Sequence, residues 1–200
     1  MRIRNVYHKL NNLRMDLVRA FRRARLRAKE GVEVGEGTIV DAGTYVQVSK
    51  GASLSVGANC TLRSSQRGYH AGMPFPTGIL VDYCGASVCL GDNTRVNGAY
   101  LHAQKRIVIG KNCVIAAGVN IIDTNGHELL SANRTVGRDA AVEIVLGDNV
   151  WVGLNSIILK GTHIGDNSVV TAGSVVKGDF PRNSLISGNL AGKIRELDIP

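Results

Sequence analysis

The chain has 200 residues and a formal net charge of +8, from 24 Lys and Arg against 16 Asp and Glu. This length accommodates one domain with short attachments, and no apolar run is long enough to cross a bilayer. The start is too basic and interrupted for a signal peptide, and the four cysteines lack a CxxC pair, so we expect a protein of the reducing cytoplasm.

Residues 1–30 are expected to form a basic amphipathic helix. They contain ten Arg or Lys against two acidic residues, so the segment carries a net charge of +8 and the rest of the chain is balanced. Its apolar residues recur at helical spacing: Val6, Leu10, Leu13, Leu17 and Phe21. One interpretation is peripheral attachment of residues 1–30 to an anionic membrane, at the inner face. The alternatives are a helix whose apolar stripe covers the open end of the next domain and a nucleic-acid arm, although we expect no nucleic-acid partner.

For residues 31–187 the sequence pattern predicts an all-β fold, a left-handed parallel β-helix of hexapeptide repeats. From Leu146 to Val176 an aliphatic residue occupies every sixth position, a period that fits neither a helix nor an exposed strand. Hexads that begin earlier, and the first five of this run, have Gly or Asn at the fourth position: Gly37, Gly43, Asn59, Asn93, Asn112, Gly118, Asn149, Asn155, Gly161, Asn167 and Gly173. These residues tolerate the left-handed backbone that a sharp corner requires, and the first-position aliphatic residues should point inward. Cys60 and Cys113 occupy the mostly small fifth position, where packing is their expected role.

Two long segments interrupt the repeat. Ser64–Asp82 holds two of the four prolines together with Tyr69 and His70, and it is expected to form an excursion over the surface, as a lid or a wall for the acceptor. Asp123–Val145 breaks the prism just before the regular run begins. Functional residues tend to lie on such loops because the rigid scaffold fixes their positions.

The second half of the chain contains four motifs in series: IGKNCVIAAGVNIIDTNGH, LGDNVWVG, VVKGDFP and GNLAGKIREL. In this order they resemble the hexapeptide-repeat acyltransferases, most closely the maltose/galactoside O-acetyltransferase branch, which includes sugar and capsular polysaccharide O-acetyltransferases. The resemblance covers 107–197. It implies an acetyltransferase that moves an acetyl group from acetyl-CoA, its co-substrate, to a hydroxyl of a sugar or surface-glycan precursor. It also implies a homotrimer with sites between subunits, and no metal is expected.

His127 stands where the family has its catalytic base. A sugar hydroxyl is a poor nucleophile until its proton is removed, and an imidazole with a pKa near 6.5 can accept that proton at neutral pH. By the same resemblance, cofactor contacts fall on seven residues: Trp151, Gly153, Leu154, Ala172, Lys177, Lys193 and Arg195. Backbone N–H groups around Gly153 and Leu154 are expected to face the thioester oxygen. The cations of the tail, 188–200, and Lys177 are expected to meet the phosphates of coenzyme A.

The acceptor side is less specific. Asn97 lies near a position where the family uses Asn or Asp for sugar hydroxyls. Asp123 and Asn125 flank His127 and are expected to bind the acceptor or to hold the imidazole tautomer, with loop solvation as the alternative.

Two other functions remain open. The first is N-acetylation of an amino sugar or nucleotide amino sugar, and the second is a non-catalytic hexapeptide scaffold. A γ-class carbonic anhydrase would need a pair of His ligands spaced by four residues, which this sequence lacks.

Overall fold

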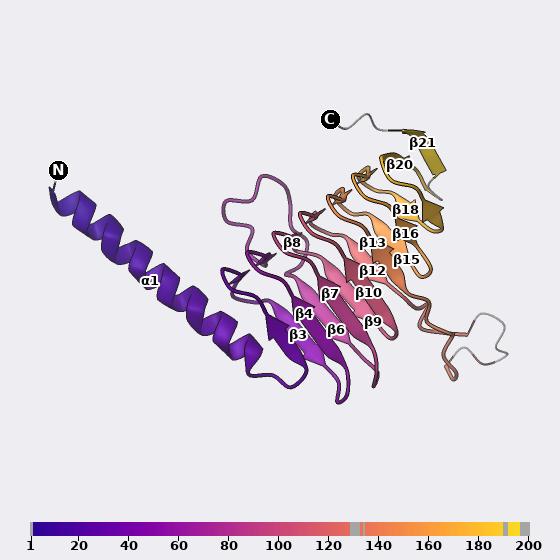
Figure 1. The fold of residues 1–200 in the computed structure, drawn as a ribbon, viewed down its shortest axis with the longest axis horizontal. Coiled ribbons are helices and arrows are strands. Elements are labelled where there is room, and N and C mark those ends of the chain that lie inside the picture. The colour runs from indigo at the N-terminus through magenta and orange to yellow at the C-terminus, as the bar shows by residue number, and fades with distance from the viewer. Residues whose placement is uncertain (1, 129–132, 134, 190–191, 197–200) are drawn as a thin grey trace.

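The computed structural model describes residues 2–128, 133, 135–189 and 192–196, with side chains for residues 15–128, 133, 135–189, 192 and 193. In this part of the chain, helix α1 (Arg2–Arg27) precedes three sheets that form the faces of a prism (Figure 1). Face A contains β1 (Val32–Val34), β4 (Ser53–Val56), β7 (Ser87–Leu90), β10 (Arg106–Ile109), β13 (Ile144–Leu146), β16 (His163–Ile164) and β19 (Asp179–Phe180).

Face B contains β2 (Ile39–Val40), β5 (Thr61–Arg63), β8 (Arg95–Asn97), β11 (Val114–Ile115), β14 (Trp151–Val152), β17 (Val169–Val170), β20 (Ser184–Ser187) and β21 (Gly192–Glu196). Face C contains β3 (Tyr45–Val48), β6 (Gly78–Val81), β9 (Tyr100–Ala103), β12 (Asn120–Ile122), β15 (Ile157–Leu159) and β18 (Val175–Val176). The chain visits faces A, B and C in turn. Turns from B to C form the B–C edge, and turns from C to A form the C–A edge. Neighbouring strands are parallel except β20 and β21, which are antiparallel.

The hexad rules predicted from the sequence are confirmed. All eleven Gly and Asn residues at the fourth position have a positive φ, between 56° and 87°. The first-position aliphatic residues are at most 7% exposed and stack along the prism interior. Cys60 and Cys113 are buried at the corners, and this burial raises the pKa of both thiols. The prism is therefore filled by aliphatic layers, as a solenoid requires.

The faces differ in the side chains that they turn outward. Face C presents half-buried apolar residues along much of its length: Leu80, Tyr100, Ile122, Ile157, Leu159 and Val175. Face A presents mainly polar and charged residues: Glu33, Ser53, Ser87, Arg106, His163 and Asp179. A flat apolar face on a solenoid is a surface suited to burial against another chain.

The C-terminal end of helix α1 packs against β1 and β2, and the N-terminal part of the helix projects away from the prism (Figure 1). Leu26 is buried at this contact. Arg23 and Arg27 pair with Glu36 at 2.9 and 2.8 Å, and a hydrogen bond from Arg27, with the nearby charge of Arg23, lowers the pKa of that carboxyl. A buried leucine and a cluster of ion pairs thus fix the helix to the first coil.

The apolar stripe of α1 does not cover the open end of the prism. Leu17 and Phe21 are 64% and 68% exposed. With 3.6 residues per turn, both lie on the side of the helix opposite to the buried Leu26. The interpretation of the stripe as a cap is therefore wrong for these residues. Within the described residues, α1 is also not apolar enough to cross a membrane.

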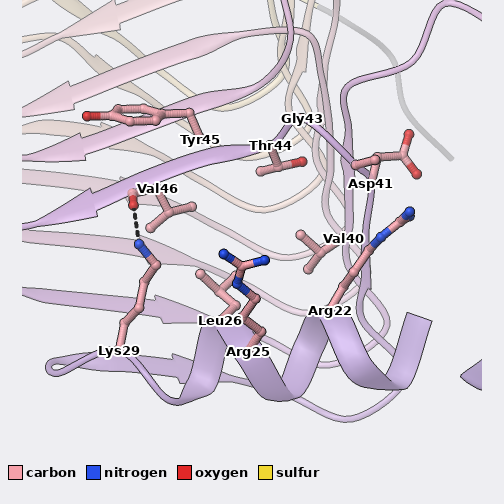
Figure 2. A pocket seen from close by; sticks show the side chains of 11 residues that line it. Arg22, Arg25, Leu26, Lys29, Val40, Asp41, Gly43, Thr44, Tyr45 and Val46 are labelled. Carbon is pink, nitrogen blue, oxygen red and sulfur yellow. Dashed lines mark hydrogen bonds between the residues drawn. The ribbon is translucent and has the colours of Figure 1, made fainter. Parts of the chain in front are cut away.

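The junction of α1 with the first coil is hollowed into a pocket of about 440 Å³ (Figure 2). Arg25 extends from the helix toward the strand that carries Val46, and Arg22 extends toward Asp41 (Figure 2). Lys29 Nζ donates a hydrogen bond to the carbonyl of Val46 at 2.8 Å. Among the residues whose side chains are described, Asp41 supplies the one carboxylate of the lining. The side of α1 next to the prism is therefore cationic, and its exposed stripe is apolar.

Candidate active site

The loop that carries His127 leaves the prism at the C–A edge, after β12. Its first residue, Asp123, is fully buried. The Asp123 carboxylate accepts three backbone hydrogen bonds of 2.8 Å, from the N–H groups of Gln104, Lys105 and Arg106. Because this carboxylate is fully buried and bonded to the preceding coil, we assign Asp123 to positioning of the loop rather than to the acceptor contact expected from the sequence.

A second carboxylate, Asp139, holds the two arms of the loop together. It accepts hydrogen bonds from the Thr124 hydroxyl at 2.6 Å and the Asn125 N–H at 3.0 Å, and it pairs with Lys160. Burial alone would raise the pKa of Asp139, but these hydrogen bonds and the Lys160 charge outweigh burial and lower the pKa to about 2. The base of the His127 loop is therefore fixed by an ionised carboxylate at neutral pH.

His127 itself is exposed, and Gly126 before it has a φ of +77°, which turns the chain sharply. The Arg138 guanidinium donates to the carbonyl of Gly126 at 3.0 Å. Asn125 is also exposed. The loop thus presents His127 and Asn125 outward from a base that Asp123 and the Asp139 cluster hold in place.

The residues expected at the reactive end of the cofactor gather on face B and the B–C edge. Trp151 is 53% exposed on β14, and Ala172 is exposed in a turn of the next coil. Leu154 is half-buried in the turn after β14, and its N–H has no acceptor among the described residues. These three residues form a wall that could hold an extended pantetheine arm.

Gly153 has a different role from the one expected. Its N–H donates to the carbonyl of Val170 at 2.8 Å, so this group is unavailable to an oxyanion. A Cβ at Gly153 would lie 2.6 Å from the backbone nitrogen of Ala172, the same crowding found at the second position of other hexads, such as Gly147. Gly153 therefore permits close stacking of the coils, and of the two backbone N–H groups expected to face the thioester oxygen only that of Leu154 is without an acceptor among the described residues.

The predicted cations fall into two places. Lys193 and Arg195 lie on β21, which extends face B, and Arg195 is in register with Trp151 through β20 and β17, about 14 Å away at the usual strand spacing. Lys177 is exposed at the C–A edge. The tail strand thus continues the face that carries Trp151, whereas Lys177 lies on the opposite edge of the same chain.

Asn97 lies in a cleft on face B, named here the face B cleft, of about 470 Å³ beneath the excursion 64–77. Asn97 is 6% exposed, and its Nδ2 donates to the carbonyl of Ile115 at 3.1 Å, which fixes the amide. Arg63 and Arg95 on neighbouring strands and Tyr69 and His70 from the excursion complete most of its lining.

The predicted site residues therefore form two separate groups in one chain. Asn97, Trp151, Leu154 and Ala172 belong to face B and the B–C edge. The His127 loop leaves at the C–A edge, the edge opposite face B, and the two excursions leave the prism on opposite sides in Figure 1. A site that uses both groups needs two chains.

Sequence reasoning missed Asp139, Lys160, Arg63 and Arg95. Spacing gives no signal for the Asp139–Lys160 pair, because the two residues meet only when the loop closes onto the next coil. Arg63 and Arg95 could have been found from the repeat itself, since hexad alignment places Arg63 beside Asn97 on face B.

Comparison with known proteins agrees with this architecture. The family model described as "Hexapeptide repeat of succinyl-transferase" matches residues 26–47, 107–122 and 143–177. The chain is 36% identical over 135 residues to the putative lipopolysaccharide biosynthesis O-acetyl transferase WbbJ of Escherichia coli K12, covering 60% of this chain and 67% of WbbJ. It is 35% identical over 115 residues to the galactoside O-acetyltransferase of the same strain, covering 57% of this chain and 56% of that relative.

A solved galactoside acetyltransferase in complex with coenzyme A matches the fold with a TM-score of 0.51 and 29% identity, covering 81% of this chain and 66% of that chain. The chain spans between 44% and 60% of the lengths of three curated relatives. The left-handed β-helix predicted from the hexads is confirmed by these likenesses. Repeat, fold and relatives together show that the chain belongs to the hexapeptide-repeat acyltransferase family.

Proposed function

We propose that the chain transfers an acetyl group from acetyl-CoA to a hydroxyl of a sugar or surface-glycan precursor. The observation that carries this proposal is the placement of the two residue groups at the two edges that flank face C. The His127 loop occupies the C–A edge, and the Trp151, Leu154 and Ala172 wall occupies face B and the B–C edge.

A homotrimer would bring these edges together. When face C of each prism turns toward a common three-fold axis, the B–C edge of one chain meets the C–A edge of the next. Face C is the face with the most outward apolar side chains, so its burial is favourable. The same packing brings His127 and Lys177 of one chain next to the face B groups of its neighbour.

The proposed reaction is a direct transfer within a ternary complex. His127 removes the proton from the acceptor hydroxyl as its oxygen attacks the thioester carbonyl. The N–H of Leu154 donates to the carbonyl oxygen as negative charge develops there. The carbon–sulfur bond then breaks, and His127 returns its proton to the leaving thiolate, so no proton or charge is left over.

Several residues of this chain suit the substrates of that reaction. Trp151 and Ala172 offer an apolar wall to the pantetheine arm, and Lys193 and Arg195 continue the same face with cations for phosphates. Asn97 offers a fixed amide to the acceptor in the face B cleft. The relatives named for O-acetyl transfer support a hydroxyl acceptor.

Mixed trimers test whether the site is shared. Ala172 is exposed, so Ala172→Glu should block the pantetheine wall without unfolding the coil, and His127→Ala removes the base. Each variant alone should be inactive. When the two variants are co-expressed at equal levels and assemble at random, about a quarter of the sites should be active. In that quarter, a chain with an intact His127 lies next to a chain with an intact Ala172. Activity that stays at background in the mixture contradicts a site shared between chains.

A thiol-release assay with acetyl-CoA tests the reaction class in the same preparations. Free sugars, nucleotide sugars, amino sugars and lipid-linked glycans serve as acceptors. Thiol release with hydroxyl acceptors supports O-transfer, and release with amino sugars alone would favour the N-acetyltransferase alternative. No release with any acceptor would favour the non-catalytic scaffold.

We also propose that α1 rests on the anionic inner face of a membrane. Leu17 and Phe21 face away from the prism, and positions 6, 10 and 13 continue their spacing toward the N-terminus. Residues 1–30 carry a net charge of +8, which suits anionic headgroups, each basic residue near the surface contributing about 1 kcal/mol. An enzyme held there would have access to lipid-linked glycans.

Vesicle co-sedimentation checks this contact. The chain should sediment with vesicles that contain phosphatidylglycerol and not with purely zwitterionic ones, and Leu17→Asp with Phe21→Asp should abolish binding. Val136→Asp, which changes an exposed apolar residue elsewhere, is the control. Undiminished binding of the double variant would overturn the lipid contact, and loss of its trimer in gel filtration would show that the stripe packs between chains instead.

A further inference from the structure

The charge of the face B cleft is not explained by transfer to a neutral sugar. Among the described residues, its lining contains Arg63, Arg95 and His70 and no Asp or Glu. A volume of about 470 Å³ is in the range of small-molecule sites. The cleft is therefore a small concave site that favours an anion.

The two arginines of the cleft have no acidic partner among the described residues. Some other arginines of the chain pair with carboxylates: Arg19 with Asp16, Arg23 and Arg27 with Glu36, and Arg106 with Glu143. Arg63 and Arg95 extend from adjacent strands of face B two register positions apart, because Arg63 pairs with Asn97 and Arg95 with Thr61, so they are diagonal neighbours about 7–8 Å apart. Two guanidinium groups at this spacing can bracket one carboxylate or phosphate.

Arg63 is also held in place before any ligand binds. Its guanidinium carbon lies 5.9 Å from the centre of the Tyr69 ring, and its Nη1 donates to the carbonyl of Arg67 at 3.5 Å. A preorganised arginine loses less side-chain entropy on binding than a free one. The excursion 64–77 thus orients a cation in the cleft.

Arg95 connects the cleft to the cofactor wall. Arg95, Val114 and Trp151 are in register on consecutive strands, so Arg95 and Trp151 lie about 10 Å apart along face B. The long Arg95 side chain and one sugar residue can together span this separation. An anionic group held at Arg95 would direct the remaining hydroxyls of the same sugar toward the thioester.

We infer that the acceptor is an acidic sugar, and that Arg95 and Arg63 bind its carboxylate or phosphate in the face B cleft. This inference rests on the proposed function, because it assigns the charge of the acceptor in that reaction. Arg95 and Arg63 are specificity residues, and His127 remains the base.

Calorimetric titration with three probes tests the site: galactose, galacturonate and galactose 1-phosphate. The anion replaces the 6-hydroxyl in galacturonate and esterifies the 1-hydroxyl in galactose 1-phosphate, so at least one of the charged probes leaves any given hydroxyl free. At least one should bind ten or more times tighter than galactose, with an advantage that shrinks as salt rises. Arg95→Gln should remove the advantage and Arg95→Lys should restore part of it. Arg67→Gln, an exposed arginine outside the lining, should leave it unchanged.

Thiol release with the same probes separates this inference from the proposed function. Three results would overturn the acidic-acceptor site. They are equal affinity for galactose and both charged probes, no binding of any probe, and a loss of the affinity advantage in Arg67→Gln as large as that in Arg95→Gln. Turnover of galactose with no advantage for a charged probe overturns it as well and leaves acetyl transfer intact. Arg95-dependent binding without thiol release from any acceptor overturns acetyl transfer and leaves the anion site standing.

Discussion

His127→Ala should lower kcat by a factor on the order of 10²–10⁴ while leaving the fold and the trimer intact. The loss is large because a sugar hydroxyl cannot attack a thioester at neutral pH unless a positioned base removes its proton. The fold should survive because His127 is exposed and its loop is held by Asp123 and Asp139 instead. Thiol release measures the turnover, and gel filtration and thermal unfolding measure the assembly.

A second histidine gives the matched control for this variant. His163 is also exposed, lies on face A and pairs with Asp179 at 2.8 Å. His163→Ala should keep near-normal turnover, since His163 belongs to neither of the two residue groups of the proposed site and its ring pairs with Asp179 on face A. Near-normal turnover in His127→Ala as well would remove the proposed mechanism, whereas a loss of trimer would show that the loop has a structural role.

The prism was predictable because its rules are local. Each hexad satisfies the same steric demands, so Asn149 or Gly161 can be assigned to a corner from its own six residues. The same register places Trp151 outward on β14 of face B, whereas its expected contact with the cofactor came from the family resemblance and stays a prediction. A repeat thus determines which residues point into the prism and which outward side chains are in register on neighbouring strands of one face.

Contacts between coils and loops lay beyond that reasoning. The pairing of Asp139 with Lys160, and the three N–H groups around Asp123, depend on how a long loop returns to the next coil. The direction of α1 depends on Leu26, a residue outside the apolar stripe that helical spacing selects. Charge alone gave no basis for preferring the orientation in which the stripe faces outward.

Asp123→Ala should be the most destabilising change in the site, lowering the free energy of unfolding by about 3 kcal/mol or more. The carboxylate is fully buried and is the acceptor for three N–H groups of the preceding coil, each at 2.8 Å. Removing it leaves those donors without their partner, and hydrogen bonds to a charged group contribute about 1.5–3 kcal/mol each. Asp123→Asn should also be costly, because its amide nitrogen would face a donor.

Asp148 offers the matched control for the buried carboxylate. It is exposed and accepts a backbone hydrogen bond from Lys111 at 2.7 Å at a comparable turn of the prism. Asp148→Ala should therefore cost about 1 kcal/mol or less. Denaturant unfolding of both variants at one protein concentration makes the comparison, since the stability of an oligomer depends on concentration. Equal losses in the two variants would show that the three bonds to Asp123 carry no special weight. A larger loss in Asp123→Ala, accompanied by lower turnover, would show that this carboxylate positions the loop on which His127 acts.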